Sequence, residues 1–221
     1  MRLLLTSAGI KNPTIHAALV DMLDKPIDEC AALLIPTAAY GHPAKLPGKA
    51  WSFVNGQPAH CPMAELGWKS LGLLELSALP SLPDEHWVPM VREADVFLAN
   101  GGDSLFLAHW MRESGFDELL PTLKGAWVGF SGGSMALTPR IGDEFKVWEP
   151  PGGGDKALGI VDFSIFPHLD HPDLPENTMA AAEEWAAGVG NPSYAIDDDT
   201  AIKWIDGDVE VVSGGHWRYF D

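Results

Sequence analysis

One segment, a glycine-rich turn around Ser131, most constrains what this chain can fold into. An apolar run at 126–128 leads into the pattern Gly-x-Ser-x-Gly, with Ser131 at its centre. The pattern is typical of a nucleophile elbow, in which a serine is held on a sharp, strained turn between a strand and a helix. Gly129, Gly132 and Gly133 leave room for the backbone to fold back at such a turn. The alternative is an ordinary glycine-rich turn between a strand and a helix.

Apolar, strand-like runs alternate with helical patterns through the first two-thirds of the chain. We expect strands at 2–6, 30–35, 71–76, 95–99, 127–130, 159–166, 194–196, 201–205 and 209–212. We expect helices at 13–23 after an Asn12 N-cap, at 84–94 with an interruption by Pro89, and at 105–111, 116–123 and 176–187. The segment 37–63 has weak periodicity and predicts a loop with a short helix. The alternation predicts an α/β fold with a mainly parallel, doubly wound sheet, helices on both faces and a C-terminal β-hairpin that turns at Asp206-Gly207.

The size of the chain favours one domain, residues 1–221. Its 221 residues, of which 46% are hydrophobic, can bury one sizeable core. No apolar run reaches the roughly 18 residues of a membrane span, and the apolar N-terminus 1–7 reads as a buried strand rather than a signal peptide. Cys30 and Cys61 lack metal-binding spacing, so we expect a reduced, cytoplasmic protein.

The charge of the chain excludes some classes of partner. There are 31 acidic and 14 basic residues, which give a formal net charge of −17. Nucleic acids need a basic face, so neither they nor anionic membranes are expected partners. A few local cations would still suffice for an acidic substrate at short range. Trp110 and Trp185, on predicted helix surfaces, leave a homodimer open.

A serine nucleophile needs a base, and His168 is the best-placed histidine. It follows the predicted strand 159–166, so it should reach the same sheet edge as Ser131, because sites form at the carboxyl ends of parallel strands. His171 is the competing base, and a surface loop position is the plain alternative for both. Acidic residues beside them could suggest a metal, but a proline interrupts the segment and the spacing of a helical zinc site is missing. We therefore expect neither metal nor cofactor.

The remaining parts of a catalytic site are an acidic partner and an oxyanion hole. The acid should orient His168 through its other ring nitrogen, and we favour Asp143 for this role. Backbone N–H groups at Gly101, Gly102 and Gly132 are the expected oxyanion donors, because glycines let the backbone approach a reacting carbonyl closely. A solvated acidic loop is the plain alternative for the acid, and the competing candidates are Glu144, Glu149, Asp162 and Ser164.

Four segments occur in a recognisable order: Asn-Gly-Gly-Asp-Ser at 100–104, the elbow around Ser131, Thr-Pro at 138–139, and the apolar run from Gly159 to His168. Together they resemble peptidase E, the serine peptidases of family S51, over most of the chain. The resemblance implies a flavodoxin-like sheet akin to that of class I glutamine amidotransferases, in which a cysteine takes the elbow position. It also implies that Ser131 is the nucleophile and His168 the base.

The chain departs from the family pattern at two points. Gly132 stands where the family usually has alanine, and the acidic residue of the family does not map onto one position. The best-known members cleave dipeptides with an N-terminal aspartate, which would need a cation near the site. Arg140 and Lys146 are the candidates by their proximity in sequence.

We therefore expect a serine exopeptidase of the dipeptidase or aminopeptidase kind. It would hydrolyse short peptides, those with an N-terminal aspartate among them. An esterase would use the same apparatus. A non-catalytic, amidotransferase-like binding module is the alternative from a different class: the lack of a clear acidic partner favours it, and the intact Ser131 and His168 oppose it.

Overall fold

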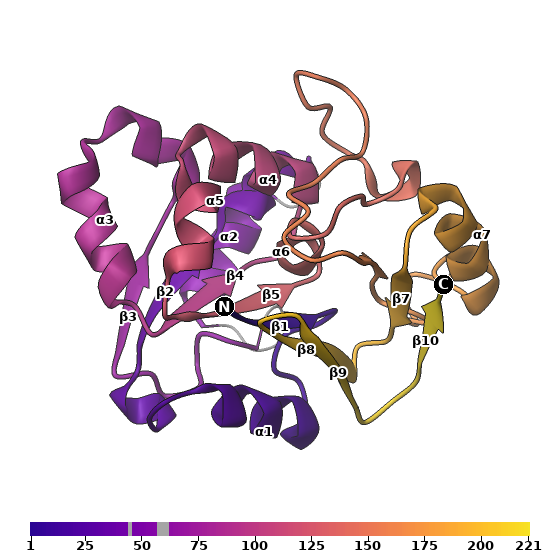
Figure 1. Cartoon of the computed structure of the whole chain (residues 1–221), viewed down its shortest axis with the longest axis horizontal. Helices are drawn as coiled ribbons and strands as arrows, with labels where there is room; N and C mark the ends of the chain where they lie inside the picture. Colours follow the sequence, from indigo (N-terminus) through magenta and orange to yellow (C-terminus); the bar gives the residue numbers. More distant parts are fainter. Residues whose placement is uncertain (44–45, 57–61) are drawn as a thin grey trace.

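The centre of the molecule is a mainly parallel β-sheet. The computed structural model of the protein describes residues 1–43, 46–56 and 62–221, so Cys61 lies outside the described residues. The strands of this sheet are β1 Arg2–Thr6, β2 Ala31–Ile35, β3 Ser70–Leu73, β4 Val96–Ala99, β5 Ala126–Phe130, β8 Thr200–Ile205 and β9 Asp208–Ser213. Their order is β3-β2-β4-β5-β1-β8-β9, and β8 and β9 form the antiparallel edge (Figure 1).

Helices cover both faces of the sheet. They are α1 Pro13–Met22, α2 Leu46–Val54, α3 Asp84–Glu93, α4 Ser104–Glu113, α5 Phe116–Leu119, α6 Gly132–Met135 and α7 Met179–Val189. Short 3-10 turns are η1 Ile27–Glu29, η2 Thr37–Gly41, η3 Leu76–Ser81, η4 Leu120–Thr122 and η5 Asp143–Phe145. α1 lies on one face of the sheet and α3, α4 and α5 lie on the other (Figure 1). The doubly wound α/β fold predicted from the sequence is confirmed.

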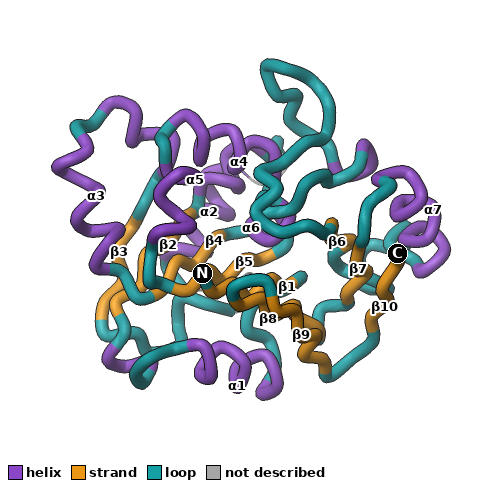
Figure 2. The backbone as a smooth tube through the Cα atoms, viewed as in Figure 1, coloured by secondary structure: helices purple, strands orange, loops and turns teal. Residues whose placement is uncertain are grey.

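A second, small sheet was not expected. It consists of β6 Ser164–Phe166, β7 Ser193–Ile196 and β10 Trp217–Phe220, in the order β10-β7-β6. Helix α7 packs beside it, and most of the chain between α6 and β6 is loop (Figure 2). Trp185 of α7 is buried in this chain's own core, where its indole N–H donates to the Ile141 carbonyl at 2.8 Å. Its expected place on a helix surface was therefore wrong.

Local signals in the sequence set several element ends. Asn12 caps α1, and its side chain accepts a hydrogen bond from the Ile15 N–H at 2.9 Å. Between β8 and β9 the turn residues Asp206 and Gly207 have φ of 50° and 105°. These positive angles are those of the tight hairpin turn that an Asp-Gly pair favours, so the predicted hairpin is confirmed.

Other boundaries differ from expectation because tertiary contacts override the local pattern. Only Ser164–Phe166 of the expected strand 159–166 pairs in a sheet. The N–H groups of Gly159 and Ile160 donate instead to Thr138 and Leu137, at 2.9 and 2.8 Å. These bonds hold the segment against the chain that follows α6.

Helix α3 continues through Pro89, contrary to the expected interruption. Trp87 and Val91 on either side of this proline are buried in the core, and their packing holds the helix together. The strand expected at 71–76 is also shorter than predicted: β3 ends at Leu73, and η3 begins at Leu76.

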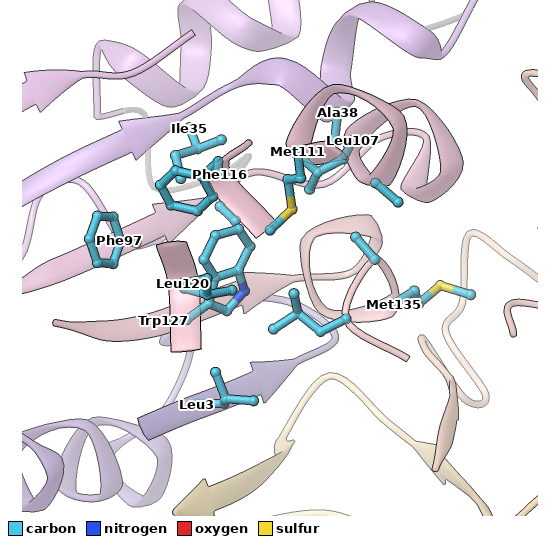
Figure 3. Close-up of a cluster of buried hydrophobic side chains, with 14 of the residues drawn as sticks. Leu3, Ile35, Ala38, Phe97, Leu107, Met111, Phe116, Leu120, Trp127 and Met135 are labelled. Carbon is cyan, nitrogen blue, oxygen red and sulfur yellow. The ribbon is translucent and has the colours of Figure 1, made fainter. Parts of the chain in front are cut away.

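The core is divided by the alternation of side chains along the buried strands. In β1, Leu3 and Leu5 belong to the cluster under α3, α4 and α5, whereas Leu4 belongs to the cluster under α1. Successive strand residues point to opposite faces, so a strand buried on both sides is apolar throughout. Figure 3 shows Trp127, Phe97 and Phe116 in the first of these clusters. Within the described residues, no helix is long and apolar enough to cross a membrane.

A buried serine ties the turn after β5 to the neighbouring strand β1. The Ser134 hydroxyl donates to the Thr6 carbonyl at 2.8 Å and accepts from the Thr6 N–H at 2.9 Å. Both residues are fully buried. The Thr6 hydroxyl in turn donates to the Gly129 carbonyl at 2.7 Å. These bonds fix the backbone of the turn that follows β5 relative to the centre of the sheet.

Replacing Ser134 with alanine should destabilise the protein. The Ser134→Ala substitution removes the buried hydroxyl that bonds both the carbonyl and the N–H of Thr6, and loss of these two bonds costs about 1–3 kcal/mol of unfolding free energy. Chemical denaturation measures this loss. Ser81→Ala, which removes an exposed hydroxyl, is the matched control and should change the free energy by less than about 0.5 kcal/mol. Equal effects of the two substitutions would contradict the role given to Ser134.

Candidate active site

Ser131 sits on a strained turn between β5 and α6. Its φ of 49° lies in the left-handed region, which is uncommon for a residue with a side chain. The Ser131 N–H donates to the Thr6 carbonyl at 2.9 Å, so the neighbouring strand β1 holds the turn in place. Backbone of this kind costs about 1–3 kcal/mol and persists only where its surroundings enforce it. The conformation has the form of the nucleophile elbow that the sequence predicts.

Close backbone contacts explain the glycines after Ser131. A Cβ at Gly132 would lie 2.4 Å from the Gly102 carbonyl oxygen, and one at Gly133 would lie 2.5 Å from that of Ala99. Side chains do not tolerate such distances from backbone atoms. The alanine that the family usually carries would therefore require the strand-to-helix turn after β4 to shift. Glycine lets this turn and the elbow approach each other.

Two of the three expected oxyanion donors remain available. The Gly101 N–H already donates to the Asn100 side-chain oxygen at 2.8 Å. The N–H groups of Gly102 and Gly132 have no hydrogen-bond acceptor within the described part of the chain. Gly102 has φ of 148°, and a Cβ there would lie 2.1 Å from the Ala38 carbonyl oxygen. The backbone of Gly102, after β4, and that of Gly132, after Ser131, are in close contact, so the two N–H groups lie near each other.

Several contacts hold His168 just after the end of β6. Its ring Nδ1 lies 2.7 Å from Oδ1 of Asp198. Its backbone N–H donates to the Ser7 hydroxyl at 3.1 Å, and its ring meets the ring of Phe130 edge to face at 6.2 Å. Because Nδ1 is engaged by a carboxylate, Nε2 is the nitrogen left to exchange a proton.

Asp198 is a half-buried carboxylate that several basic groups surround. Its second oxygen lies 3.0 Å from Lys11 Nζ and 3.5 Å from His171 Nε2. Burial by itself would raise the pKa of Asp198, but the hydrogen bonds and charges of His168 and Lys11 outweigh burial and lower it from 3.8 to about 2. Asp198 is therefore ionised at neutral pH. His171, the competing base in the sequence, contacts the same carboxylate.

Asp143, the acid favoured from the sequence, does not contact His168. Its side chain is 82% exposed and lies 3.5 Å from Lys146. The structure thus corrects the expected pairing and gives His168 the carboxylate of Asp198 instead. None of the competing candidates, which all lie among the described residues, has a hydrogen bond or ion pair with His168. Glu149 contacts Lys146, and Ser164 donates to the Arg140 carbonyl. Asp162 is exposed, and Glu144 lines the cavity described below.

The sequence contained one signal for Asp198. It follows the predicted strand 194–196, as His168 follows the strand before it in the small sheet. In the structure β6 and β7 are parallel neighbours, so residues just after each strand meet at one edge. A search confined to the chain between Ser131 and His168 could not find an acid that lies downstream of both.

A cavity of about 530 Å³ opens beside Ser131 and His168. Ser131, His168 and Gly102 line it. Its volume lies in the range of small-molecule sites. No group of three His, Cys, Asp or Glu side chains among the described residues is placed to hold a metal ion. Apolar side chains form part of the wall, among them Met135, Phe145, Val147, Phe166 and Leu174.

Asp103 anchors the loop that closes one side of this cavity. It is buried and caps α4, where it accepts from the Phe106 N–H at 2.7 Å. Its other oxygen accepts from the Trp148 N–H, also at 2.7 Å. Burial raises the pKa of Asp103, although these hydrogen bonds oppose the rise. The bond to Trp148 holds the neighbouring Val147 in the cavity wall.

The Asp198 contacts predict a specific pH dependence of stability. The pKa of Asp198 is lower in the folded state, so its ionised form stabilises the fold. This stabilisation is complete above pH ~4 and is lost as the pH falls towards 2. The loss amounts to about 2 kcal/mol of unfolding free energy. Urea unfolding of the wild type between about pH 5 and pH 2 should show this decrease, and the Asp198→Asn variant should lack it. Asp143→Asn, which changes an exposed carboxylate, should retain the wild-type decrease.

Comparison with solved structures supports the same architecture. The chain aligns with a protein described as a candidate peptidase E from Listeria monocytogenes EGD-e at a TM-score of 0.69 and 21% identity, over 97% of this chain and 98% of that one. A peptidase from an acI-B1 actinobacterium aligns at a TM-score of 0.64 and 19% identity, over 99% and 96% of the chains. At these identities the likeness is one of fold.

Sequence comparison adds partial matches to one class of protein and one extensive match. The chain is 36% identical over 113 residues to a cobyric acid synthase of Chloroflexus aurantiacus, and 31% identical over 101 residues to one of Roseiflexus castenholzii. These matches span only 22% and 20% of those proteins. In contrast, the model of peptidase family S51 matches residues 3–212. The match extends over nearly the whole chain, and the protein therefore belongs to peptidase family S51, the serine-type peptidases.

Proposed function

We propose that the protein is a serine exopeptidase that hydrolyses short peptides, with Ser131 as nucleophile, His168 as base and Asp198 as the acid that orients the base. The observation that carries the proposal is the His168–Asp198 hydrogen bond of 2.7 Å at the edge of the cavity that Ser131 also lines. A cavity of about 530 Å³ favours a short peptide over an extended protein segment.

In the proposed first step, Ser131 Oγ attacks the carbonyl carbon of the scissile bond. His168 Nε2 takes the hydroxyl proton as the new C–O bond forms. Asp198 accepts the Nδ1 proton of His168 in a hydrogen bond, which selects the required tautomer and stabilises the imidazolium. The negative charge on the substrate oxygen is stabilised by the free N–H groups of Gly102 and Gly132.

The second half of the cycle reverses these proton transfers. The imidazolium of His168 gives its proton to the leaving amine as the C–N bond breaks, and an acyl-enzyme on Ser131 results. Water then attacks the acyl carbon while His168 takes a proton from it. Collapse of the second tetrahedral intermediate returns the proton to Ser131 Oγ and releases the carboxylate product.

Two other functions use parts of the same site. An esterase would need the same nucleophile and base, so an ester substrate panel distinguishes it from a peptidase. A binding module without turnover was favoured by the lack of an acid for His168, and the contact with Asp198 removes that argument. The proposal therefore stands on a complete set of nucleophile, base and acid.

Ser131→Ala should abolish peptide hydrolysis. Removal of a serine nucleophile lowers kcat by a factor of about 10⁴ or more. Hydrolysis of a dipeptide panel measures the loss, and a fluorophosphonate probe should label the wild type but not the variant. Ser81→Ala, remote from the cavity, is the control and should keep full activity. A Ser131→Ala protein that stays folded and hydrolyses peptides at the wild-type rate would refute the proposal.

Asp198→Asn should impair catalysis more than Asp143→Asn. An amide at position 198 no longer selects the tautomer of His168, and kcat should fall by a factor of about 10² to 10⁴. Asp143→Asn should leave kcat within about two-fold of the wild type, because surface substitutions of this kind have small effects. Both substitutions convert a carboxylate into an amide of the same size, so the comparison isolates the position. A larger loss of kcat at position 143 would overturn the assignment of the acid.

A further inference from the structure

The charged side chains in the cavity wall are acidic. Glu144, Glu176 and Glu184 line the cavity, and they come from η5, from the loop before α7 and from α7 itself. None of the described residues that line it is a lysine or an arginine. The basic side chains in its wall are the imidazoles of His42 and His168.

These three carboxylates differ from their neighbours in having no lysine or arginine partner among the described residues. Glu183, next to Glu184, pairs with Arg218, and Asp143, next to Glu144, pairs with Lys146. Within the described part of the chain, no lysine or arginine lies within ion-pair distance of any of the three cavity glutamates. Their charge is therefore available to a bound molecule.

The cations expected to hold an aspartate side chain are occupied elsewhere. Arg140 contacts Asp155 at 3.0 Å and donates to the Val189 carbonyl at 2.8 Å. Lys146 contacts Asp143 and Glu149. Neither Arg140 nor Lys146 lines the cavity. A substrate carboxylate would thus meet carboxylates of the same sign, and like charges disfavour binding.

The cavity wall also has the apolar surface that a long basic side chain needs. Phe145, Val147 and Leu174 lie in the same wall as the glutamates. Lysine and arginine place their methylene stems on apolar surface and direct their charged ends to polar groups. The α-ammonium group of a peptide can pair with one of the three glutamates. The other two remain available to the charged end of a basic side chain. An acidic cleft also raises the local concentration of cationic ligands.

On the basis of the proposed peptidase function, we propose that the cavity selects short peptides that carry a lysine or arginine side chain, with Glu144, Glu176 and Glu184 as specificity-determining residues. The preference is opposite in charge to one for an N-terminal aspartate. It follows from the acidic wall and its apolar neighbours, and it concerns recognition rather than the bond-breaking step.

Turnover of matched dipeptides tests this preference. The panel pairs alanine with arginine, with citrulline or with aspartate, in both orders, so that arginine and citrulline compare charge at nearly constant shape. At low salt the better arginine peptide should have a kcat/KM about ten-fold above that of its citrulline partner. High salt should reduce this ratio, because solvent-exposed charges are screened.

Single substitutions assign the preference to the glutamates. Glu144→Gln, Glu176→Gln and Glu184→Gln should each lower the arginine-to-citrulline ratio by about two- to five-fold, the effect of one exposed ion pair. Glu183→Gln is the matched control, since it removes the neighbouring carboxylate on α7 outside the cavity, and it should leave the ratio unchanged.

A binding measurement separates this inference from the proposed function. Calorimetric titration of the Ser131→Ala protein with the arginine, citrulline and aspartate dipeptides reports recognition without turnover. If the wild type hydrolyses none of the peptides but the variant binds arginine peptides best, the exopeptidase proposal fails and the charge preference stands. If citrulline or aspartate peptides are bound and hydrolysed as well as arginine peptides, the charge preference is overturned while the peptidase proposal stands.

Discussion

The backbone of Thr6 at the end of β1 is the support on which the rest of the site depends. Its carbonyl accepts from the Ser131 N–H and from the Ser134 hydroxyl, and its N–H donates to that hydroxyl. A positive φ at Ser131 is unfavourable in an isolated chain and requires such enforcement. β1 can provide it because it is buried at the centre of the sheet, directly beside β5. Ser131 is thus held in a strained conformation by a largely buried strand.

The second part of the site depends on the small sheet and has a different physical basis. There a half-buried carboxylate, Asp198, is kept ionised against the cost of burial by His168 and Lys11. Lys11 lies in the loop that follows β1 of the large sheet, whereas Asp198 follows β7 of the small sheet, so segments after strands of both sheets set the charge balance of Asp198. The orientation of His168 therefore depends on how the two sheets pack, and not on the segment around His168 alone.

The net charge of the protein and the charge of its cavity wall have to be considered separately. The net charge of −17 describes the whole surface, but most of the cations near the cavity are paired with acids outside it. What remains in the described cavity wall is a set of unpaired glutamates beside apolar side chains. A family resemblance carries over the glycine-rich turn around Ser131, because this turn needs a fixed set of small residues. It does not carry over a substrate preference, which depends on the few side chains around the elbow.

Much of the architecture was predictable from the sequence because its signals are local. The glycines around Ser131, the Asn12 cap, the Asp206-Gly207 turn and the apolar strands each fix a backbone conformation within a few residues. The elbow, the position of His168 after a strand and the mainly parallel arrangement of the sheet followed from these signals. Errors arose where a local pattern competed with packing, as at Pro89 and at the start of the expected strand 159–166.

Only the tertiary structure decided which carboxylate contacts His168. Asp143 and Asp198 are equally plausible as residue types, and no periodicity distinguishes them. The parallel pairing of β6 and β7 brings Asp198 to His168, while Asp143 remains 82% exposed beside Lys146. The sequence by itself determined the fold class and the turn that carries Ser131, because a strand, a turn and a cap are set by neighbouring residues. The partner of His168 and the charge of the cavity depend on contacts between distant segments, and these exist only in the folded chain.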